Sequence, residues 1–454
     1  MSMPRTLVSA LLGVGLMLTL TAAPVTTATA APVPATSPST PRGLPQVSSA
    51  LAGSAWLAGQ FTSSGYIPST TSPGSADLTA TVNAVLALAS AGSDPTTSHR
   101  ALSYLASHIN AYVKVDGSDG PGQLALLILD THALGLSPTS FGGTDLVSRL
   151  LATERTSGAD AGLFGVQSAT YDGAYRQGLA LAALAGAGVT GGSQVAAAEK
   201  WLLDQQCADG GWTSLITSSN PCNGSPAAYE GPDTNSTALA VQGLSAEGAL
   251  KVTAARKADS FLAGAEDSDA GWGYEPNAAG SPGSTDPDST ALVIQALLAL
   301  GTSPSAATFV KGAADPVTTL QSFQLAKGSG KGAFYFPGTP TADLLATYQA
   351  VPALAGVKDP FNLAVTTSSL PRGSVGTEYS ATLEARGGHG SYTWSLVGGS
   401  TLPSGLTLNR STGKIGGKPR RAGTSTVTVE VTDPLTATFP HTRDTAWKVL
   451  TLTV

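Results

Sequence analysis

The sequence predicts a two-part protein: a closed double ring of six helical hairpins, an (α/α)6 toroid, followed by an all-β sandwich. Two observations predict it. Over residues 47–357, apolar segments that end in or near glycine alternate with amphipathic segments, with a period of about fifty residues. Over residues 361–454, runs of alternating β-branched and polar residues, separated by Gly, Pro and Asn turns, replace the helical pattern.

The helical part contains six apolar segments, each long enough for a helix and apolar enough to be buried. The glycine near the end of each segment suits a helix C-cap. A more polar segment with a bulky apolar stripe, such as "AAAEKWLLDQQ", precedes each one. Two concentric rings of six helices satisfy this alternation most simply, and an open solenoid of helix pairs is the alternative. The inner segments span residues 76–92, 122–135, 172–188, 233–248, 285–301 and 342–356.

Residues 1–30 have the features of a secretory signal peptide. Arg5 gives a positive start, Leu7 to Ala23 is apolar, and Ala28-Thr29-Ala30 is a small-x-small cleavage sequence. A membrane anchor is the alternative, and the glycines within the apolar run argue against it. A Pro/Ser/Thr-rich linker over residues 31–46 follows. We therefore expect an exported protein, secreted or at the cell surface, with no transmembrane segment in the mature chain.

The cysteine content and the charge limit the classes of function that the sequence allows. Cys207 and Cys222 are the only cysteines, and in an exported protein we expect them to form one disulfide across a short polar loop. A metal or thiol site is the alternative, but no histidine lies near them in the sequence. The formal net charge of −6, without a basic patch, argues against nucleic-acid binding.

The C-terminal part resembles a known family. The strings "GTEYSATLEARGGHGSYTWSL" and "LPSGLTLNRSTGKIGGKPRRAGTSTVTVEVTD" resemble the immunoglobulin-like domains of many bacterial surface proteins. The resemblance implies an immunoglobulin-like sandwich over residues 361–454 that acts as a spacer or docking module. It departs at "PLTATFPHTRDTAWK", which looks like an insertion. Some relatives are grouped with calcium-binding cadherin-like folds, but this tail lacks the dense acidic clusters that such sites need.

The helical part resembles a second group of families. Tight aromatic turns follow several outer segments, and "QQCADGGW" (205–212) and "EDSDAGWGY" (266–274) are the clearest. They resemble the Gln–Trp repeats of squalene-hopene cyclases and the prenyltransferase/squalene cyclase repeat. The inner segments are also similar to those of the cobalamin carriers. These resemblances imply the toroid fold, and either terpene-cyclase-like chemistry or capture of cobalamin or another corrinoid.

One inner segment carries a motif of its own. "TDPDSTALVIQALLALG" (285–301) resembles the acidic DxDDTA motif of class II terpene cyclases, which implies Asp286 and Asp288 as catalytic candidates. Ser289 stands where the motif has its final aspartate. Without that neighbouring carboxylate, a strong general acid at Asp288 is less plausible.

The same motif also repeats within the chain, which favours a structural role for its first aspartate. "DTNSTALAVQGL" (233–244) aligns onto it without gaps, so that Asp233 matches Asp286 and Asn235 matches Asp288. A catalytic acid is needed once, whereas a helix cap is needed in every repeat. Capping is therefore the favoured role of Asp286, and three other aspartates stand near the starts of inner segments. They are Asp77, Asp172 and Asp343.

Side-chain amides also recur in the inner segments. Asp288 and Gln295 are seven residues apart, as are Asn235 and Gln242, which places each pair on one helix face. The amides either face a wet central cavity or bond to neighbouring helices. The recurring positions are Asn83, Gln177, Gln242, Gln295 and Gln349.

The direction of the chain predicts where a ligand would bind. All inner helices of such a toroid run the same way, so their N-termini and the preceding loops share one mouth, which suits a neutral polar or amphipathic ligand. The leading hypothesis is a non-catalytic binding or adhesion protein for a small molecule, a glycan or a protein. The alternatives are a terpene-cyclase-like or glycan-acting enzyme using Asp286 and Asp288, and a cobalamin-binding protein; no metal site is predicted. The predicted ligand-binding residues are Asn235, Gln242, Asp288, Gln295, Tyr175, Tyr229 and Tyr274.

Overall fold

A computed structural model describes most of the chain beyond residue 46. The predicted signal peptide and linker, and Tyr229, lie outside the described residues. The described residues are 47–165, 172–214, 222, 231–276, 285–338, 340–361, 363–386, 392–396, 400–433 and 444–454.

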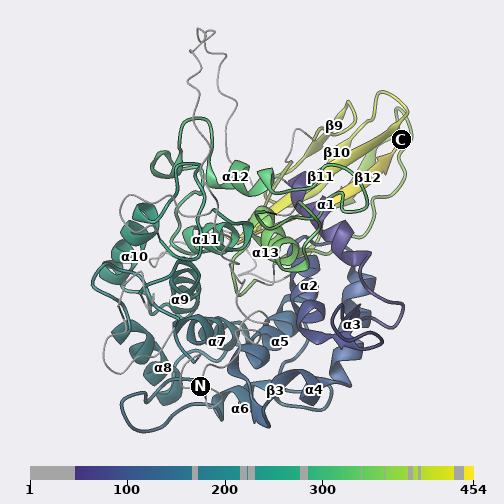
Figure 1. The fold of residues 1–454 in the computed structure, drawn as a ribbon. Coiled ribbons are helices and arrows are strands. Elements are labelled where there is room, and N and C mark those ends of the chain that lie inside the picture. The colour runs from purple at the N-terminus through teal and green to yellow at the C-terminus, as the bar shows by residue number, and fades with distance from the viewer. Residues whose placement is uncertain are drawn as a thin grey trace. The chain divides into compact units, whose positions relative to one another are not determined.

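Six inner helices in the described part of the chain form a closed ring (Figure 1). Each contacts the next one along the chain, and the last, α13, contacts the first, α2. This closure confirms the predicted (α/α)6 toroid and rules out the open solenoid. The six helices are α2 (Leu78–Ser90), α5 (Pro121–Ala133), α7 (Ala174–Gly186), α9 (Thr234–Ala246), α11 (Pro287–Ala299) and α13 (Leu344–Ala355).

The outer layer precedes the inner one in each hairpin and is less regular. Two of its helices are short, because the chain turns sharply after only six or seven residues. The outer helices are α1 (Val47–Ala58), α3 (Pro95–Ala106), α6 (Leu146–Leu151), α8 (Ser193–Asp204), α10 (Val252–Gly264) and α12 (Pro316–Ser322). Small elements complete the hairpins: α4 (Ile109–Val113), a 3-10 turn at Ala307–Phe309, and the two-residue strands β1 (Ile67–Pro68), β2 (Ala76–Asp77), β3 (Lys114–Val115) and β4 (Ser118–Asp119).

Every inner helix ends at a glycine, as the sequence predicts. The six glycines have φ between 57° and 75°, a left-handed conformation that glycine adopts without steric cost. The residue after each glycine donates its backbone N–H to a carbonyl five residues earlier, as Thr302 does to Leu297 at 2.8 Å. This is the hydrogen bond of the Schellman motif, and it explains why glycine recurs at these positions. They are Gly92, Gly135, Gly188, Gly248, Gly301 and Gly356.

The two clearest aromatic turns are packing elements. The side chains of Trp212 and Trp272 are fully buried. Each indole N–H donates to the outer helix before its turn, Trp212 to the carbonyl of Leu202 at 2.7 Å and Trp272 to that of Leu262 at 2.8 Å. The turns therefore join each outer helix to the ring.

Helices α7 and α9 lie closer together than any side chain would permit. A Cβ atom on Gly178 would lie 2.2 Å from the carbonyl oxygen of Leu239, and one on Gly243 would lie 2.1 Å from the carbonyl oxygen of Gly178. Backbone therefore packs directly on backbone across this pair of helices, and both glycines are required for it.

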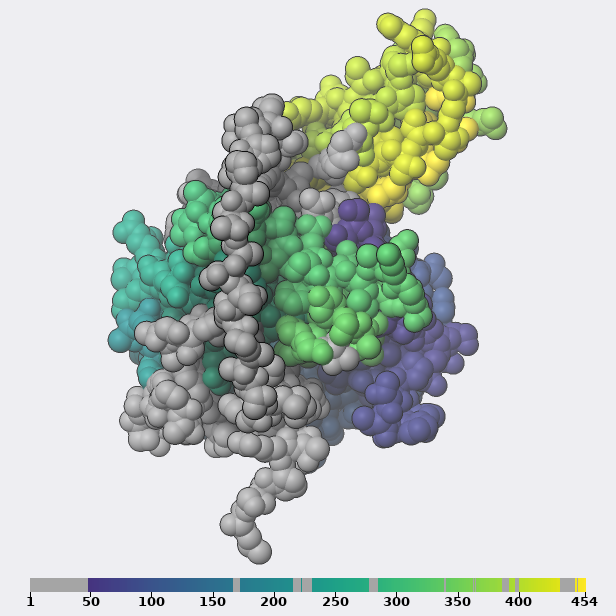
Figure 2. Space-filling view, turned by 45° about the horizontal axis from the view of Figure 1, so that its top comes forward, coloured from purple at the N-terminus to yellow at the C-terminus, as the bar shows by residue number. Residues whose placement is uncertain are grey.

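The strands after the toroid form two three-stranded antiparallel sheets and a two-stranded one. Their inward residues, among them Trp394, Ile415 and Val429, make a hydrophobic core of their own. Figure 2 shows the yellow residues gathered in one body, and the sheets with their shared core confirm the predicted β-sandwich. The sheets are β6–β10–β9, β12–β11–β8 and β5–β7, formed by β5 (Ala364–Val365), β6 (Tyr379–Thr382), β7 (Ala385–Arg386), β8 (Thr393–Leu396), β9 (Leu406–Leu408), β10 (Lys414–Gly417), β11 (Thr424–Asp433) and β12 (Asp444–Thr453).

Residues 357–361, which we call the joint segment, follow α13 and pack on the toroid. Val357 and Phe361 are buried in the main hydrophobic cluster of the ring. Pro360 lies against Gly186 at the end of α7, with 3.0 Å between its Cβ and a Cβ placed on that glycine. The segment thus crosses from α13 toward the C-terminal ends of the opposite inner helices.

No helix in the described part of the chain has both the length and the apolar character needed to cross a bilayer.

Candidate functional site

Asp286 caps helix α11. One carboxylate oxygen accepts the backbone N–H of Ser289 at 2.7 Å and the other accepts its hydroxyl at 2.9 Å. Asp233 caps α9 in the same way, through the N–H of Ser236 at 2.6 Å. The capping role predicted from the repeat is therefore confirmed, and it also holds for Asp77 and Asp343, which cap α2 and α13.

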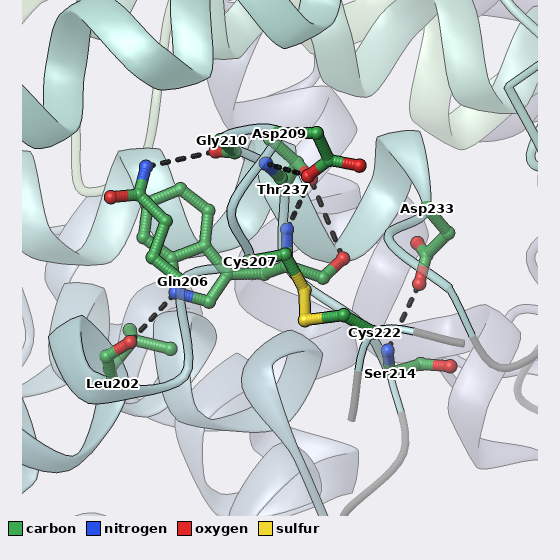
Figure 3. Close-up of a disulfide and its surroundings, with 11 residues drawn as sticks. Leu202, Gln206, Cys207, Asp209, Gly210, Ser214, Cys222, Asp233 and Thr237 are labelled. Carbon is green, nitrogen blue, oxygen red and sulfur yellow. Dashed lines mark hydrogen bonds between the residues drawn. A yellow bond between two sulfur atoms is a disulfide. The ribbon is translucent and has the colours of Figure 1, made fainter. Parts of the chain in front are cut away.

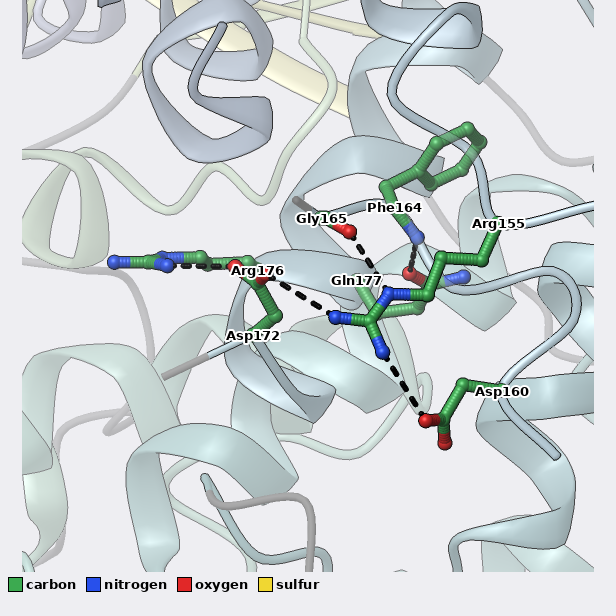
Figure 4. Close-up of polar contacts among 7 residues, drawn as sticks. All are labelled: Arg155, Asp160, Phe164, Gly165, Asp172, Arg176 and Gln177. Atoms are coloured by element: carbon green, nitrogen blue, oxygen red, sulfur yellow. Dashed lines mark hydrogen bonds and ion pairs between the residues drawn. The ribbon is translucent and has the colours of Figure 1, made fainter. Parts of the chain in front are cut away.

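Asp172 does not follow this pattern, so the expectation that it acts as a cap is wrong. Helix α7 begins after Gly173, which contributes no side chain to the cap. The fully buried carboxylate of Asp172 instead pairs with Arg176 at 2.8 Å and with Arg155 at 4.0 Å (Figure 4). Arg155 also donates to the carbonyl of Gly165 at 3.0 Å, so the charged group holds the chain on either side of the loop that precedes α7.

Asp288 lies two positions after Asp286 and is in a different environment. Its side chain is only 5 % exposed, and neither carboxylate oxygen has a hydrogen-bond partner among the described residues. Burial, followed by the negative charges of Asp286 and Asp343, raises the pKa of this carboxyl well above its usual range. A buried carboxyl without partners favours the neutral acid, which can donate one hydrogen bond and accept others.

The charge of Asp288 acts on two tyrosines from opposite sides of the ring. Burial, then the charges of Asp233 and Asp288, raise the pKa of Tyr175 to about 12. Burial, then the charge of Asp288 and the phenol of Tyr175, raise the pKa of Tyr348. Tyr175 is on α7 and Tyr348 is on α13, opposite members of the ring, and both side chains are partly buried. We call Tyr175, Asp288 and Tyr348 the axial cluster.

The other predicted mouth residues hold the loops in place. The Tyr274 hydroxyl pairs with that of Ser214 at 2.9 Å, and its carbonyl accepts the backbone N–H of Thr234 at 3.0 Å. Burial raises the pKa of Asp233 to about 7, and hydrogen bonds from Ser236, Ser214 and Tyr274 oppose that rise. Asn235, the counterpart of Asp288, accepts a 3.3 Å bond from the hydroxyl of Thr234. These groups have partners within the chain, whereas Asp288 has none among the described residues.

The recurring amides are spread over different levels of the ring. Asn83 bonds to the carbonyl of Thr79 in its own helix at 2.9 Å. Gln177 spans the gap to the outer layer, accepting from Phe164 and donating to the carbonyls of Gly162 and Ala198.

The two amides in the predicted ligand-binding set also lie away from the N-terminal ends of the inner helices. Gln242 accepts the backbone N–H of Asp359 at 3.1 Å, in the C-terminal half of α9. Gln295 lies two turns after Asp288 and is 4 % exposed. Of the predicted set, Asp288 and Tyr175 are linked by the charge of Asp288, which is one cause of the raised pKa of Tyr175. Tyr348 was not predicted, although an aromatic ring within a segment of small and aliphatic residues was a signal for it.

The predicted disulfide joins Cys207 and Cys222 (Figure 3). Cys207 is 2 % exposed and its backbone N–H donates to Gly211 at 2.9 Å, within the aromatic turn that contains Trp212. The bridge therefore links Cys222 to the aromatic turn of this hairpin. No group of three or more His, Cys, Asp or Glu side chains in the described ranges is arranged to hold a metal ion.

Comparison with known sequence families identifies the C-terminal part. Residues 362–449 match the sequence family described as "Putative Ig domain". None of the curated proteins matches this chain in sequence.

Three solved structures resemble the helical part. A protein from Actinoplanes is 16 % identical, with a TM-score of 0.47 over 68 % of this chain and 99 % of its own. The type II terpene cyclase MstE from Scytonema is 15 % identical in its ligand-free form, with a TM-score of 0.43 over 69 % of this chain and 98 % of its own. A variant of that cyclase in complex with the product merosterolic acid A has a TM-score of 0.44 at 16 % identity, over 68 % of this chain and 96 % of its own.

Proposed function

We propose that the protein is an exported, non-catalytic binding protein whose toroid takes a neutral polar or amphipathic ligand at the axial cluster. The observation that carries the proposal is the carboxyl of Asp288, buried to 5 % exposure with two oxygens that have no partner among the described residues. Buried polar groups are normally hydrogen-bonded, so an orphaned carboxyl on a ring axis points to a missing partner.

The neighbours of Asp288 indicate the chemistry of that partner. Tyr175 and Tyr348 are partly buried and come from helices opposite each other in the ring. Their rings supply apolar surface and their hydroxyls donate or accept hydrogen bonds. Together with a neutral carboxylic acid, they suit a ligand that carries hydroxyl, ether or carbonyl oxygens on an apolar body.

Three features support export. The sequence begins with an apolar run that ends in a small-x-small cleavage sequence. A disulfide joins Cys207 and Cys222, and disulfides persist mainly in oxidising compartments. The C-terminal part matches an immunoglobulin-like family over residues 362–449, and we propose that it serves as a spacer or docking module.

Acid catalysis at Asp288 is the second candidate, because one observation favours it. The raised pKa keeps a proton on this carboxyl, as a general acid requires. The carboxylate of Asp286 already accepts two hydrogen bonds from Ser289, so Asp288 would act without a free neighbouring carboxylate.

Two variants of Asp288 separate binding from catalysis. Asparagine retains hydrogen-bonding capacity but has no transferable proton, whereas leucine removes both. The mature chain is screened by thermal shift and calorimetry against neutral oligosaccharides, cobalamin and prenyl alcohols, and products are sought by mass spectrometry. If the protein only binds its ligand, the Asp288→Asn variant retains most of the affinity, the Asp288→Leu variant loses it, and no variant produces turnover. Turnover by the wild type that disappears in Asp288→Asn would instead establish the enzyme.

A matched control excludes a general effect of losing an aspartate. Asp145 caps the outer helix α6 through the N–H of Ser148 at 2.9 Å. Asp145→Asn should leave ligand affinity unchanged.

A further inference from the structure

A second group of buried polar atoms lies where the joint segment meets the ring. Asp130 on α5 is fully buried, and neither of its carboxylate oxygens has a hydrogen-bond partner among the described residues. Gln242 on α9 is 1 % exposed with an unpartnered amide nitrogen, and Asp359 in the joint segment is 8 % exposed with one unpartnered oxygen. Such an accumulation is unusual, because each orphaned buried group costs about 1–3 kcal/mol.

These groups belong to one cluster. The backbone N–H of Asp359 donates to the side-chain oxygen of Gln242 at 3.1 Å. The charge of Asp359 acts on Asp130, and the charge of Asp130 acts on the phenol of Tyr112, whose buried hydroxyl also has no partner in the described ranges. We call Tyr112, Asp130, Gln242 and Asp359 the joint cluster. It connects α4, α5 and α9 with the segment that follows α13.

The surroundings of the joint cluster disfavour negative charge. Two buried carboxyls act on each other, and Asp130 is close to the C-terminal end of α5, where the helix dipole is negative. Lys358 is the positive side chain that acts on Asp359, whereas the charge that acts on Asp130 is the negative one of Asp359. His132 on α5 lies beside Pro360, its ring 3.3 Å from a Cβ placed on Gly186.

We propose that residues 357–361 form an acid-locked joint. While Asp130 and Asp359 are protonated, the segment stays packed on the ring through Val357, Phe361 and the bond to Gln242. When both carboxyls ionise, their mutual repulsion and the cost of two buried charges exceed the attraction of Lys358 for Asp359, and the segment detaches. Detachment frees the connection to the β-sandwich without unfolding either part.

The direction of the pH dependence follows from proton binding. Burial raises the pKa of Asp359 to about 6, and burial with the charge of Asp359 raises the pKa of Asp130 well above its usual range. The packed joint therefore holds more protons than the detached one, so raising the pH weakens packing. Packing is strongest below about pH 4, the value for a solvated aspartate, and weakens as the pH rises through 6.

Hydrogen exchange of the mature full-length chain tests the proposal at the joint itself. The amide of Asp359, which donates to Gln242, reports directly on detachment. We expect its protection, corrected for intrinsic exchange, to be about tenfold or more greater at pH 5 than at pH 7.5, the factor that one pKa unit implies. Peptides from α9 and α11 should keep constant protection, because the ring remains folded.

Variants identify the responsible groups. The double variant Asp130→Asn/Asp359→Asn keeps the shape of both side chains without their ionisation, and its pH effect should fall below about twofold, the limit expected once neither group titrates. Asp259→Asn, on outer helix α10, is the matched control and should keep the full effect. Asp259 also has a carboxyl whose pKa is raised by burial.

Three results would overturn the proposal. They are equal protection of the wild-type joint at both pH values, an undiminished pH effect in the double variant, or a parallel change in the α9 and α11 peptides. If the double variant fails to pack at either pH, Asp130→Asn alone decides, because it alters no residue of the segment. Its pH effect must then be smaller than that of the wild type.

Discussion

The two ends of the ring treat a buried carboxyl differently. At the helix starts, Asp288 is on a helix whose cap is supplied by Asp286, and its charge acts on two partly buried tyrosines. At the helix ends, Asp130 is fully buried, and the charge of Asp359 in the joint segment acts on it. Both carboxyls lack hydrogen-bond partners among the described residues, so orphaned acids alone do not define a binding site. The two carboxyls differ in the groups that act on them: two tyrosines interact with Asp288, whereas Asp359 of the joint segment interacts with Asp130.

The largest effect on stability should come from the backbone contact between α7 and α9, on which both ends of the ring depend. Gly178→Ala places a methyl group 2.2 Å from the carbonyl oxygen of Leu239 and forces α7 and α9 apart. We expect the free energy of unfolding to fall by about 3 kcal/mol, the upper range for overpacking. Chemical denaturation measures it.

Gly264→Ala is the matched control for that variant. Gly264 ends the outer helix α10 and a Cβ there meets nothing within 4 Å. The substitution should raise stability slightly, by about 0.5–1 kcal/mol, because alanine favours helix more than glycine does. Equal effects of the two substitutions would mean that the close packing of α7 on α9 does not hold the ring together.

A smaller effect on stability should follow when the carboxyl of Asp130 or that of Asp288 is neutralised. It reflects a property that the two ends of the ring share. The pKa of Asp130 and that of Asp288 are both raised by burial. Each group therefore makes the folded protein less stable as the pH rises above the pKa of a solvated aspartate. Asp130→Asn and Asp288→Asn should each raise the free energy of unfolding at pH 7.5 by about 1 kcal/mol or more, the value of one pKa unit. Near pH 4 the gain should vanish.

Urea denaturation at both pH values measures these gains, with Asp145→Asn as a control. The pKa of Asp145 is lowered by hydrogen bonds from Ser148, so removing its charge should lower stability at neutral pH. A gain in only one of the two buried variants would show that the other carboxyl is paired in solution, and the comparison between the ends would fail.

The architecture was readable from the sequence because it depends on local signals that recur. Glycine closes all six inner helices through the same left-handed turn, and aspartate caps four of them. A repeated local motif carries its own structural explanation, so Asp286 could be recognised as a cap from its match with Asp233.

The site was less predictable because it depends on distance across the ring. Tyr175 acts on the pKa of Tyr348 only because six hairpins close, and no spacing within one segment encodes that interaction. Gln242 carries the same seven-residue spacing from Asn235 as Gln295 from Asp288, yet it bonds to Asp359, more than a hundred residues away. Asp172 matched the caps in position but lies beside two arginines. Long-range partners decided these roles.

The smallest expected effect separates the two aspartates of one motif. Asp286→Ala removes a side chain that accepts two hydrogen bonds at the start of α11 and should cost about 1 kcal/mol, the usual value of an N-cap. Asp288→Ala removes a carboxyl with no partner among the described residues and should leave the thermal midpoint at neutral pH unchanged or slightly raised. Differential scanning calorimetry of the ligand-free chain measures both.

The same pair of variants also tests how the two ends of the ring differ. If Asp288→Ala destabilises the ligand-free protein as much as Asp286→Ala, Asp288 has a structural partner in solution and is no more available to a ligand than Asp130. If only Asp286→Ala destabilises it, the carboxyl of Asp288 is retained at a cost in stability. Such a cost without a gain to the fold would support the proposal that Asp288 serves a ligand.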